Sequence, residues 1–127
     1  LNLIITTPEP TSIMDAYVMV KLLKSAGYIN KNVVLVNKCS NDEEGAMSFS
    51  KLNVASKHFL YEDLHLLGFM LIDPLVRKSI IDQEVLLKNY QNTKSAGQVR
   101  KLSAGLIEFI QMVNINQSRL SAYNNKR

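Results

Sequence analysis

The sequence predicts a three-layer α/β fold built around a mainly parallel sheet. Three short apolar segments recur about thirty residues apart, at 3–7, 33–36 and 66–72. Their near-continuous Val, Ile and Leu content is typical of strands that are buried on both faces. Helical patterns separate them, and this alternation indicates right-handed crossovers between parallel strands. Because three such strands expect cover on both faces and further neighbours, we predict a partial sheet of about three strands with covering helices.

The composition supports a single globular unit. The chain has 127 residues, of which 46% are hydrophobic and 20% charged, and this length is common for one domain. Such a composition excludes disordered and collagen-like proteins. The longest apolar runs are far shorter than the roughly 20 residues that cross a bilayer. The lone Cys39 cannot form an internal disulfide, which favours a reducing cytoplasm but also fits the many secreted proteins that use no disulfide.

A helix is expected between the first two apolar segments. Ser12 and Asp15 form an S-x-x-D capping box just after Pro10, at the start of an apolar pattern with helical spacing. Gly27 is well placed to cap the carboxyl end of this helix.

A second helix is expected before the third apolar segment, where Ser40 and Glu43 repeat the capping box. The residues that lie roughly along its apolar face are Phe49, Leu52, Ala55, Phe59 and Leu60. Acidic residues at 42–44 open this helix, where negative charge interacts well with the helix dipole.

The remaining chain predicts two helical stretches. The first covers 75–87 with a break near Asp82, and the second covers 94–113. Residues 114–127 are polar, and we expect them to fray. One domain over 1–113 followed by a frayed tail over 114–127 is therefore the expected organisation.

The positive charge is concentrated in the carboxyl-terminal part. The formal net charge is +4, with −2 on residues 1–73 and +6 on residues 74–127. A cationic end can meet anionic lipid, nucleic acid or an acidic partner, but a solvated basic helix face is the more ordinary explanation. We predict no direct binding of nucleic acid.

Ligands of parallel α/β proteins bind at the carboxyl ends of the strands. The segments that follow the three predicted strands are Thr7-Pro8-Glu9-Pro10, Asn37-Lys38-Cys39-Ser40 and Asp73-Pro74. These segments are the candidates for a binding site. His58 and His65 have no ligand partners at a suitable spacing, so no metal site is predicted.

The first of these segments belongs to a longer run that resembles a known family. The run is Ile4-Ile5-Thr6-Thr7-Pro8-Glu9-Pro10-Thr11-Ser12-Ile13-Met14-Asp15-Ala16-Tyr17. It is similar to the flagellar MinD-like ATPases of the FlhG (FleN, YlxH) group. The similarity continues through Val34-Leu35-Val36-Asn37-Lys38, Glu44-Gly45, Phe59-Leu60, Leu67-Gly68, Ile72-Asp73, Gln83 and Ser95-Ala96. Residues 1–113 are therefore expected to be the C-terminal half of a MinD/ParA-like P-loop ATPase domain, and the chain a fragment of it.

The resemblance implies that the intact protein binds ATP or ADP with Mg²⁺ through a deviant Walker A loop. The five glycines of this sequence stand alone, and none begins the G-x-x-x-x-G-K-[ST] pattern that cradles phosphate. The parent is expected to be an ATPase. We expect this chain alone to be inactive and to bind no nucleotide tightly.

The resemblance also implies an adenine-side half of the nucleotide pocket. Asn37 stands where the family places an asparagine against the base, and a carboxamide can pair with adenine. Ser40 stands where the N-K-x-D box of GTPases has its carboxylate, which favours adenine over guanine. Asp73 and Pro74 occupy the place of the family's P-E-D-type loop, from which this chain departs. A strand-end cap for Asn37 and a helix cap for Asp73 are the alternatives.

Three further residues match positions near the nucleotide-dependent dimer interface of MinD-type proteins. They are Glu9, Thr11 and Asp15. A carboxylate beside a lysine that repositions when ATP binds would act as an electrostatic latch. For Asp15, a place in the capping box is an alternative explanation.

The function implied by the resemblance is control of flagellar placement and number. The intact bacterial protein would form a homodimer with ATP and associate peripherally with the inner membrane from the cytoplasm. Its partners would be flagellar assembly or regulatory proteins, including the flagellar GTPase. The alternative is a non-enzymatic α/β interaction scaffold that kept the fold without ATPase activity.

Overall fold

The structure is a computed structural model that describes residues 1–28 and 31–124, with side chains as far as Ile115. Its elements in chain order are β1 (Asn2–Thr6), α1 (Pro10–Ser25), β2 (Asn32–Cys39), α2 (Asp42–Ala55), the π-helix η1 (Ser56–Leu60), β3 (His65–Leu71), α3 (Pro74–Ile81), α4 (Leu86–Asn89) and α5 (Lys94–Asn124). The three predicted strands are present, each within a few residues of its expected position.

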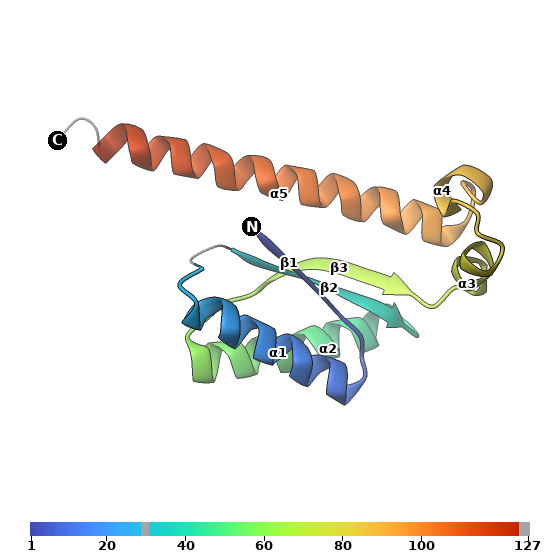
Figure 1. The fold of residues 1–127 in the computed structure, drawn as a ribbon, viewed down its shortest axis with the longest axis horizontal. Helices are drawn as coiled ribbons and strands as arrows, with labels where there is room; N and C mark the ends of the chain where they lie inside the picture. The colour runs from blue at the N-terminus through green and yellow to red at the C-terminus, as the bar shows by residue number, and fades with distance from the viewer. Residues whose placement is uncertain (29–30, 125–127) are drawn as a thin grey trace.

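The strands form one parallel sheet in the order β1-β2-β3. Successive right-handed crossovers in one direction place their helices on the same face of a sheet. Accordingly, α1 and α2 lie together beneath the sheet, and α5 crosses its other face above β3 (Figure 1). The predicted partial α/β sheet with covering helices is confirmed.

The hydrophobic core lies between the sheet and the pair α1 and α2. Its buried members are Ile4, Ala16, Val20, Val34, Val36, Cys39, Leu52, Leu60 and Leu64. The other face of β1 is open, because Leu3 is 42% exposed and Ile5 is 58% exposed. The apolar runs predict that every strand is covered on both faces. At β1 this cover is incomplete.

The start of α1 differs from the predicted capping box. The helix begins at Pro10 with Glu9 as its N-cap, which makes no side-chain capping bond, and Asp15 lies beyond the first turn. Proline is favoured at the first helical position because its missing N–H is not needed there. Ser12 is therefore already inside the helix, and its hydroxyl accepts a hydrogen bond from the Thr7 amide at 3.0 Å. The predicted box is wrong.

The end of α1 is as predicted. Gly27 has a φ of 76°, which is the left-handed conformation that favours glycine. The Tyr28 amide donates to the Leu23 carbonyl at 3.0 Å, and the Gly27 amide donates to the Lys24 carbonyl at 3.0 Å. These two bonds form a Schellman motif after the helix.

The cap of α2 lies one residue later than predicted. Asn41 is the N-cap, and its side chain accepts from the Glu44 amide at 2.8 Å. The Glu44 carboxylate accepts from the Ser40 amide at 2.6 Å. The predicted pair of Ser40 and Glu43 is therefore wrong, because β2 extends to Cys39 and delays the start of the helix.

The end of this helical segment also differs from the expected amphipathic pattern. Residues 56–60 form the π-helix η1, which widens the turn and shifts the register of the side chains. Phe59 is consequently 67% exposed, although the pattern assigned it to the buried face. Lys24 reaches across from α1, and its ammonium group donates to the Leu60 carbonyl at the end of η1.

The carboxyl-terminal helices confirm one predicted boundary and correct another. The chain breaks at Asp82, which caps α3. In contrast, α5 runs on to Asn124, past the predicted end at Val113. No Gly or Pro occurs over 114–124 to interrupt it. The last part of the predicted frayed tail, residues 125–127, lies outside the described residues.

Candidate functional site at the carboxyl edge of the sheet

The carboxyl ends of the three strands lie along one edge of the sheet, as a parallel arrangement requires (Figure 1). The Ile72 amide, just after β3, donates to the Cys39 carbonyl at the end of β2 at 2.9 Å. This bond holds the segment that leads to Asp73 beside the end of β2. The segments singled out in the sequence after β2 and β3 are thus neighbours.

The turn from β1 to α1 is tied down by Ser12. Its hydroxyl accepts from the Thr7 amide and lies 3.0 Å from the Thr6 hydroxyl. The Thr7 hydroxyl oxygen is buried and has no hydrogen-bond partner within the described part of the chain. Glu9 follows this turn with an exposed side chain. Sequence reasoning treated Ser12 as a helix cap and so missed its role in shaping this turn.

Asn37 does not follow β2, as the sequence predicts, but lies inside the last part of the strand. The pairing with β3 is irregular between Val36 and Cys39, so Asn37 and Lys38 bulge from the ladder. The Asn37 side-chain oxygen accepts from the Lys38 amide at 2.8 Å. Lys38 has a φ of 57°, an uncommon conformation for a residue other than glycine.

This bulge leaves a defined set of polar groups at the edge. The Asn37 side-chain oxygen keeps one lone pair after accepting from Lys38, and its NH₂ group has no partner among the described hydrogen bonds. A left-handed, non-glycine residue costs conformational energy, and such residues cluster at functional sites. The local sequence does not predict the bulge, because the bulge arises from the pairing of β2 with β3.

Asp73 is the N-cap of α3, and both of its carboxylate oxygens are engaged. One accepts from the Leu75 amide at 2.9 Å, and the other accepts from the Ser95 hydroxyl at 2.5 Å. The hydrogen bond from Ser95, followed by that from the Leu75 amide, lowers the pKa of Asp73. Pro74 is the exposed first residue of α3. The helix-cap role considered for Asp73 is present.

The start of α5 is anchored to the end of β3 by contacts that no sequence pattern predicts. Ser95 is 1% exposed and donates to Asp73, and the Gln98 side chain accepts from the Leu71 amide at 3.3 Å. Thr93 caps the helix by accepting from the Ala96 amide at 3.2 Å. Thr93 is the local sequence feature that indicates the start of α5, because threonine is favoured at helix N-caps.

Several hollows lie beside these elements, and two of them border β1 and Pro8. A groove of about 730 Å³ runs along the outer edge of β1 and includes Asp15 and Met19 of α1. A smaller hollow of about 320 Å³ lies between Pro8 and the first turns of α2, where Asn41 and Lys51 contribute to its lining. Neither is lined by Asn37, Asp73 or Pro74. Of the predicted base-side and dimer-face residues, Asp15 alone lines one of these two hollows.

The other titratable groups at this edge point to structural roles. Cys39 is fully buried, and its burial, together with the nearby Glu44 and Asp42, raises the pKa of the thiol. Over the described ranges, 1–28 and 31–124, there is no cluster of three or more His, Cys, Asp or Glu suited to a metal ion. In the same part of the chain, no helix is both long and apolar enough to cross a membrane.

A three-strand parallel sheet with helices on both faces, and with irregular backbone at its carboxyl edge, places the chain in the three-layer α/β class. No protein-family model matches the chain. Comparison with curated proteins identifies two relatives.

The antiactivator FleN of Pseudomonas aeruginosa is 32% identical over 94 residues, which cover 74% of this chain and 34% of FleN. The flagellum site-determining protein YlxH of Helicobacter pylori is 28% identical over 116 residues, which cover 83% of this chain and 38% of YlxH. The chain thus spans little more than a third of the length of these relatives. The matches confirm the predicted resemblance to the FlhG, FleN and YlxH group, over one segment of those proteins.

Proposed function

We propose that this chain is the C-terminal part of a flagellar regulator of the MinD-like group. In the intact protein, ATP binding would drive dimerisation, and hydrolysis would reset it. The similarity to a flagellar antiactivator and to a flagellum site-determining protein, over 74–83% of the chain, carries this proposal. Within it, the chain supplies the base side of the nucleotide pocket and part of the dimer face.

The open edge of β1 supports the presence of a larger sheet in the intact protein. Among the described strands β1 pairs only with β2, and the groove of about 730 Å³ borders its outer edge. Leu3 and Ile5 also leave one face of β1 exposed. An additional strand would pair with this edge and cover the groove. A phosphate-binding loop at the end of that strand would lie close to the turn that contains Glu9.

The bulge at the end of β2 supports base recognition by Asn37. Its free NH₂ group and remaining lone pair can donate to and accept from an adenine edge. Asp73 acts as a positioning residue in this proposal, because its carboxylate already caps α3 and holds Ser95. Contacts of the third segment with the base then come from its backbone and from the exposed ring of Pro74.

The exposed residues Glu9, Thr11 and Asp15 lie along the first turns of α1 and its approach. We assign them to the dimer face, where Asp15 also borders the groove along β1. The intact dimer would associate peripherally with the cytoplasmic side of the inner membrane and engage flagellar assembly or regulatory proteins, including the flagellar GTPase.

Calorimetric titration with ATP and Mg²⁺ tests the nucleotide part of this proposal in the full-length protein. The variant Asn37→Asp keeps an oxygen to accept from the Lys38 amide but removes the NH₂ donor. We expect its ATP affinity to fall about ten-fold, which corresponds to about one lost hydrogen bond. Asn89→Asp, on the exposed end of α4, is the matched control and is expected to bind as the parent does.

The chain of 127 residues is titrated in the same way. We expect its dissociation constant for ATP to be about 1 mM or higher, which corresponds to a binding free energy of about 4 kcal/mol at most. Tight binding by this chain alone would contradict the division of the pocket between two parts of the protein. Unchanged ATP affinity of Asn37→Asp would remove Asn37 from the pocket. A full-length protein that binds no ATP would favour the interaction scaffold instead.

A further inference from the structure

The turn between α3 and α4 exposes an unusual amount of aliphatic surface. Ile80 is 71% exposed, Ile81 68%, Val85 63% and Leu87 41%, all within eight consecutive residues. Scattered single apolar residues are ordinary on a protein surface, but a concentration of large aliphatic side chains marks an interaction site. We call the residues 77–88 the α3–α4 surface.

Backbone hydrogen bonds define the turn in this surface. After α3 the Glu84 amide donates to the Ser79 carbonyl at 2.8 Å, and Gln83 adopts a φ of 56°. Together with the bond from the Gln83 amide to the Ile80 carbonyl at 3.2 Å, this forms a Schellman motif without a glycine.

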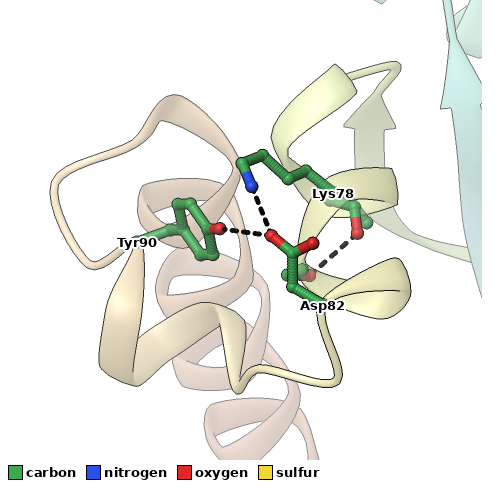
Figure 2. Close-up of polar contacts among 5 residues, drawn as sticks. Lys78, Asp82 and Tyr90 are labelled. Atoms are coloured by element: carbon green, nitrogen blue, oxygen red, sulfur yellow. Dashed lines mark hydrogen bonds and ion pairs between the residues drawn. The ribbon is translucent and has the colours of Figure 1, made fainter.

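Side chains reinforce the same turn. Lys78 forms an ion pair with the Asp82 carboxylate, and the Tyr90 hydroxyl donates to the same oxygen at 3.4 Å (Figure 2). Lys78 and Asp82 lie on α3 and at its end, whereas Tyr90 closes α4, so the three side chains bridge the two helices. The aliphatic side chains are thereby presented by a pre-organised scaffold, which reduces the entropy that binding must overcome.

The charge around the aliphatic residues is positive. Arg77 and Lys88 are exposed, and neither takes part in an ion pair within the described part of the molecule. Asp82 is neutralised by Lys78, which leaves Glu84 as the remaining carboxylate of residues 77–88. A partner that supplies both apolar contacts and carboxylates would complement this surface.

The position of the surface separates it from the proposed nucleotide-binding sheet. It follows β3, at the opposite edge of the sheet from β1 (Figure 1). An additional strand at β1 would therefore lie two strands away from the element that leads into residues 77–88. Pairing at β1 does not account for the exposure of these side chains.

We propose that the α3–α4 surface docks an acidic amphipathic helix of a partner protein. Its apolar stripe would cover Ile80, Val85 and Leu87, and carboxylates flanking the stripe would meet Arg77 and Lys88. A helix laid into such a surface contributes apolar residues at a spacing of three or four. A lipid surface is less well matched, because α3 and α4 have only 8 and 4 residues and Tyr90 is tied to Asp82.

Fluorescence anisotropy with two synthetic helical peptides tests the proposal on the full chain. The peptides are about five turns long and share one leucine stripe. One carries glutamates on the remaining positions, and the other carries lysines. We expect the glutamate peptide to bind at least about ten-fold more tightly. The double variant Arg77→Glu/Lys88→Glu should lose that preference, and Ile80→Ser/Val85→Ser should weaken the glutamate peptide by a similar factor.

The matched control is Lys21→Glu/Lys31→Glu, which changes the net charge equally at exposed positions away from this surface. It should bind the glutamate peptide as the parent chain does. Equal binding of the two peptides, or equal loss in the control, would overturn the proposal. Sedimentation with phosphatidylglycerol vesicles that depends on Arg77 and Lys88, without peptide binding, would overturn it in favour of a membrane contact. Far-UV circular dichroism of each variant establishes that its helices are intact.

Discussion

Replacement of Asp73 by alanine should destabilise the chain through two separate contacts. The carboxylate caps α3 through the Leu75 amide at 2.9 Å and accepts from the Ser95 hydroxyl at 2.5 Å. Ser95 is 1% exposed, so its hydroxyl would have no water to replace the lost acceptor. Because Ser95 lies at the start of α5, the change also loosens the attachment of α5 to the end of β3.

The magnitude follows from these two contacts. Loss of an N-cap costs about 1 kcal/mol. A buried hydroxyl without a partner costs about 1–3 kcal/mol. We therefore expect the free energy of unfolding to fall by about 2–4 kcal/mol. Asp73→Asn retains one acceptor oxygen, so it should cost about half as much.

Urea denaturation followed by far-UV circular dichroism measures these changes. A double-mutant cycle with Ser95→Ala isolates the bond between the two side chains. The double variant should be less destabilised than the sum of the single variants by about 1–3 kcal/mol, because alanine at 95 leaves no orphaned hydroxyl. A loss below about 0.5 kcal/mol for Asp73→Ala, or strict additivity in the cycle, would refute this account.

The same carboxylate gives a signed dependence on pH. Its hydrogen bonds hold the pKa of Asp73 below the usual value in the folded chain. The stabilisation is therefore fully present above the unfolded pKa of about 3.9. It is lost as the pH falls through the folded pKa. The stability difference between the parent chain and Asp73→Ala should shrink over that acidic range and stay constant between pH 6 and 8, roughly two or more units above it.

Three substitutions test the packing by urea denaturation. Gly45→Ala places a methyl group 2.5 Å from the Phe69 ring, so it should destabilise the folded chain by about 1–3 kcal/mol. Gly97→Ala meets nothing within 4 Å and should stabilise α5 by up to about 1 kcal/mol. Leu52→Ala, at a fully buried position, should cost about 2–5 kcal/mol in the same assay, and a cost under about 1 kcal/mol would contradict its place in the core. The Cys39 thiol is fully buried and its pKa is raised, so it should react with Ellman's reagent only at the rate of unfolding; rapid reaction in buffer would contradict its burial.

Much of the candidate site could be located from the sequence, but its local geometry could not. Apolar runs indicated where the strands lie, and both Asn37, in the last part of β2, and Asp73, after β3, do lie at the carboxyl edge. The bulge at Asn37 escapes prediction because it depends on the register between β2 and β3. The hydrogen bond between Asp73 and Ser95 could not be predicted for a similar reason, since the two residues are 22 positions apart in the chain.

Apolar runs and motif spacing in the sequence predict about three strands, their parallel direction and the resemblance to flagellar MinD-like proteins, because these patterns are local properties of the chain. Three features appear only in the tertiary structure: Asn41 caps α2, Phe59 faces outward after η1, and an ion pair braces the exposed α3–α4 surface. Each of these depends on contacts between elements. Neighbours in space determine the pairing between strands, the π-helical register shift and the polar bridge of three residues. A local sequence pattern does not predict such contacts.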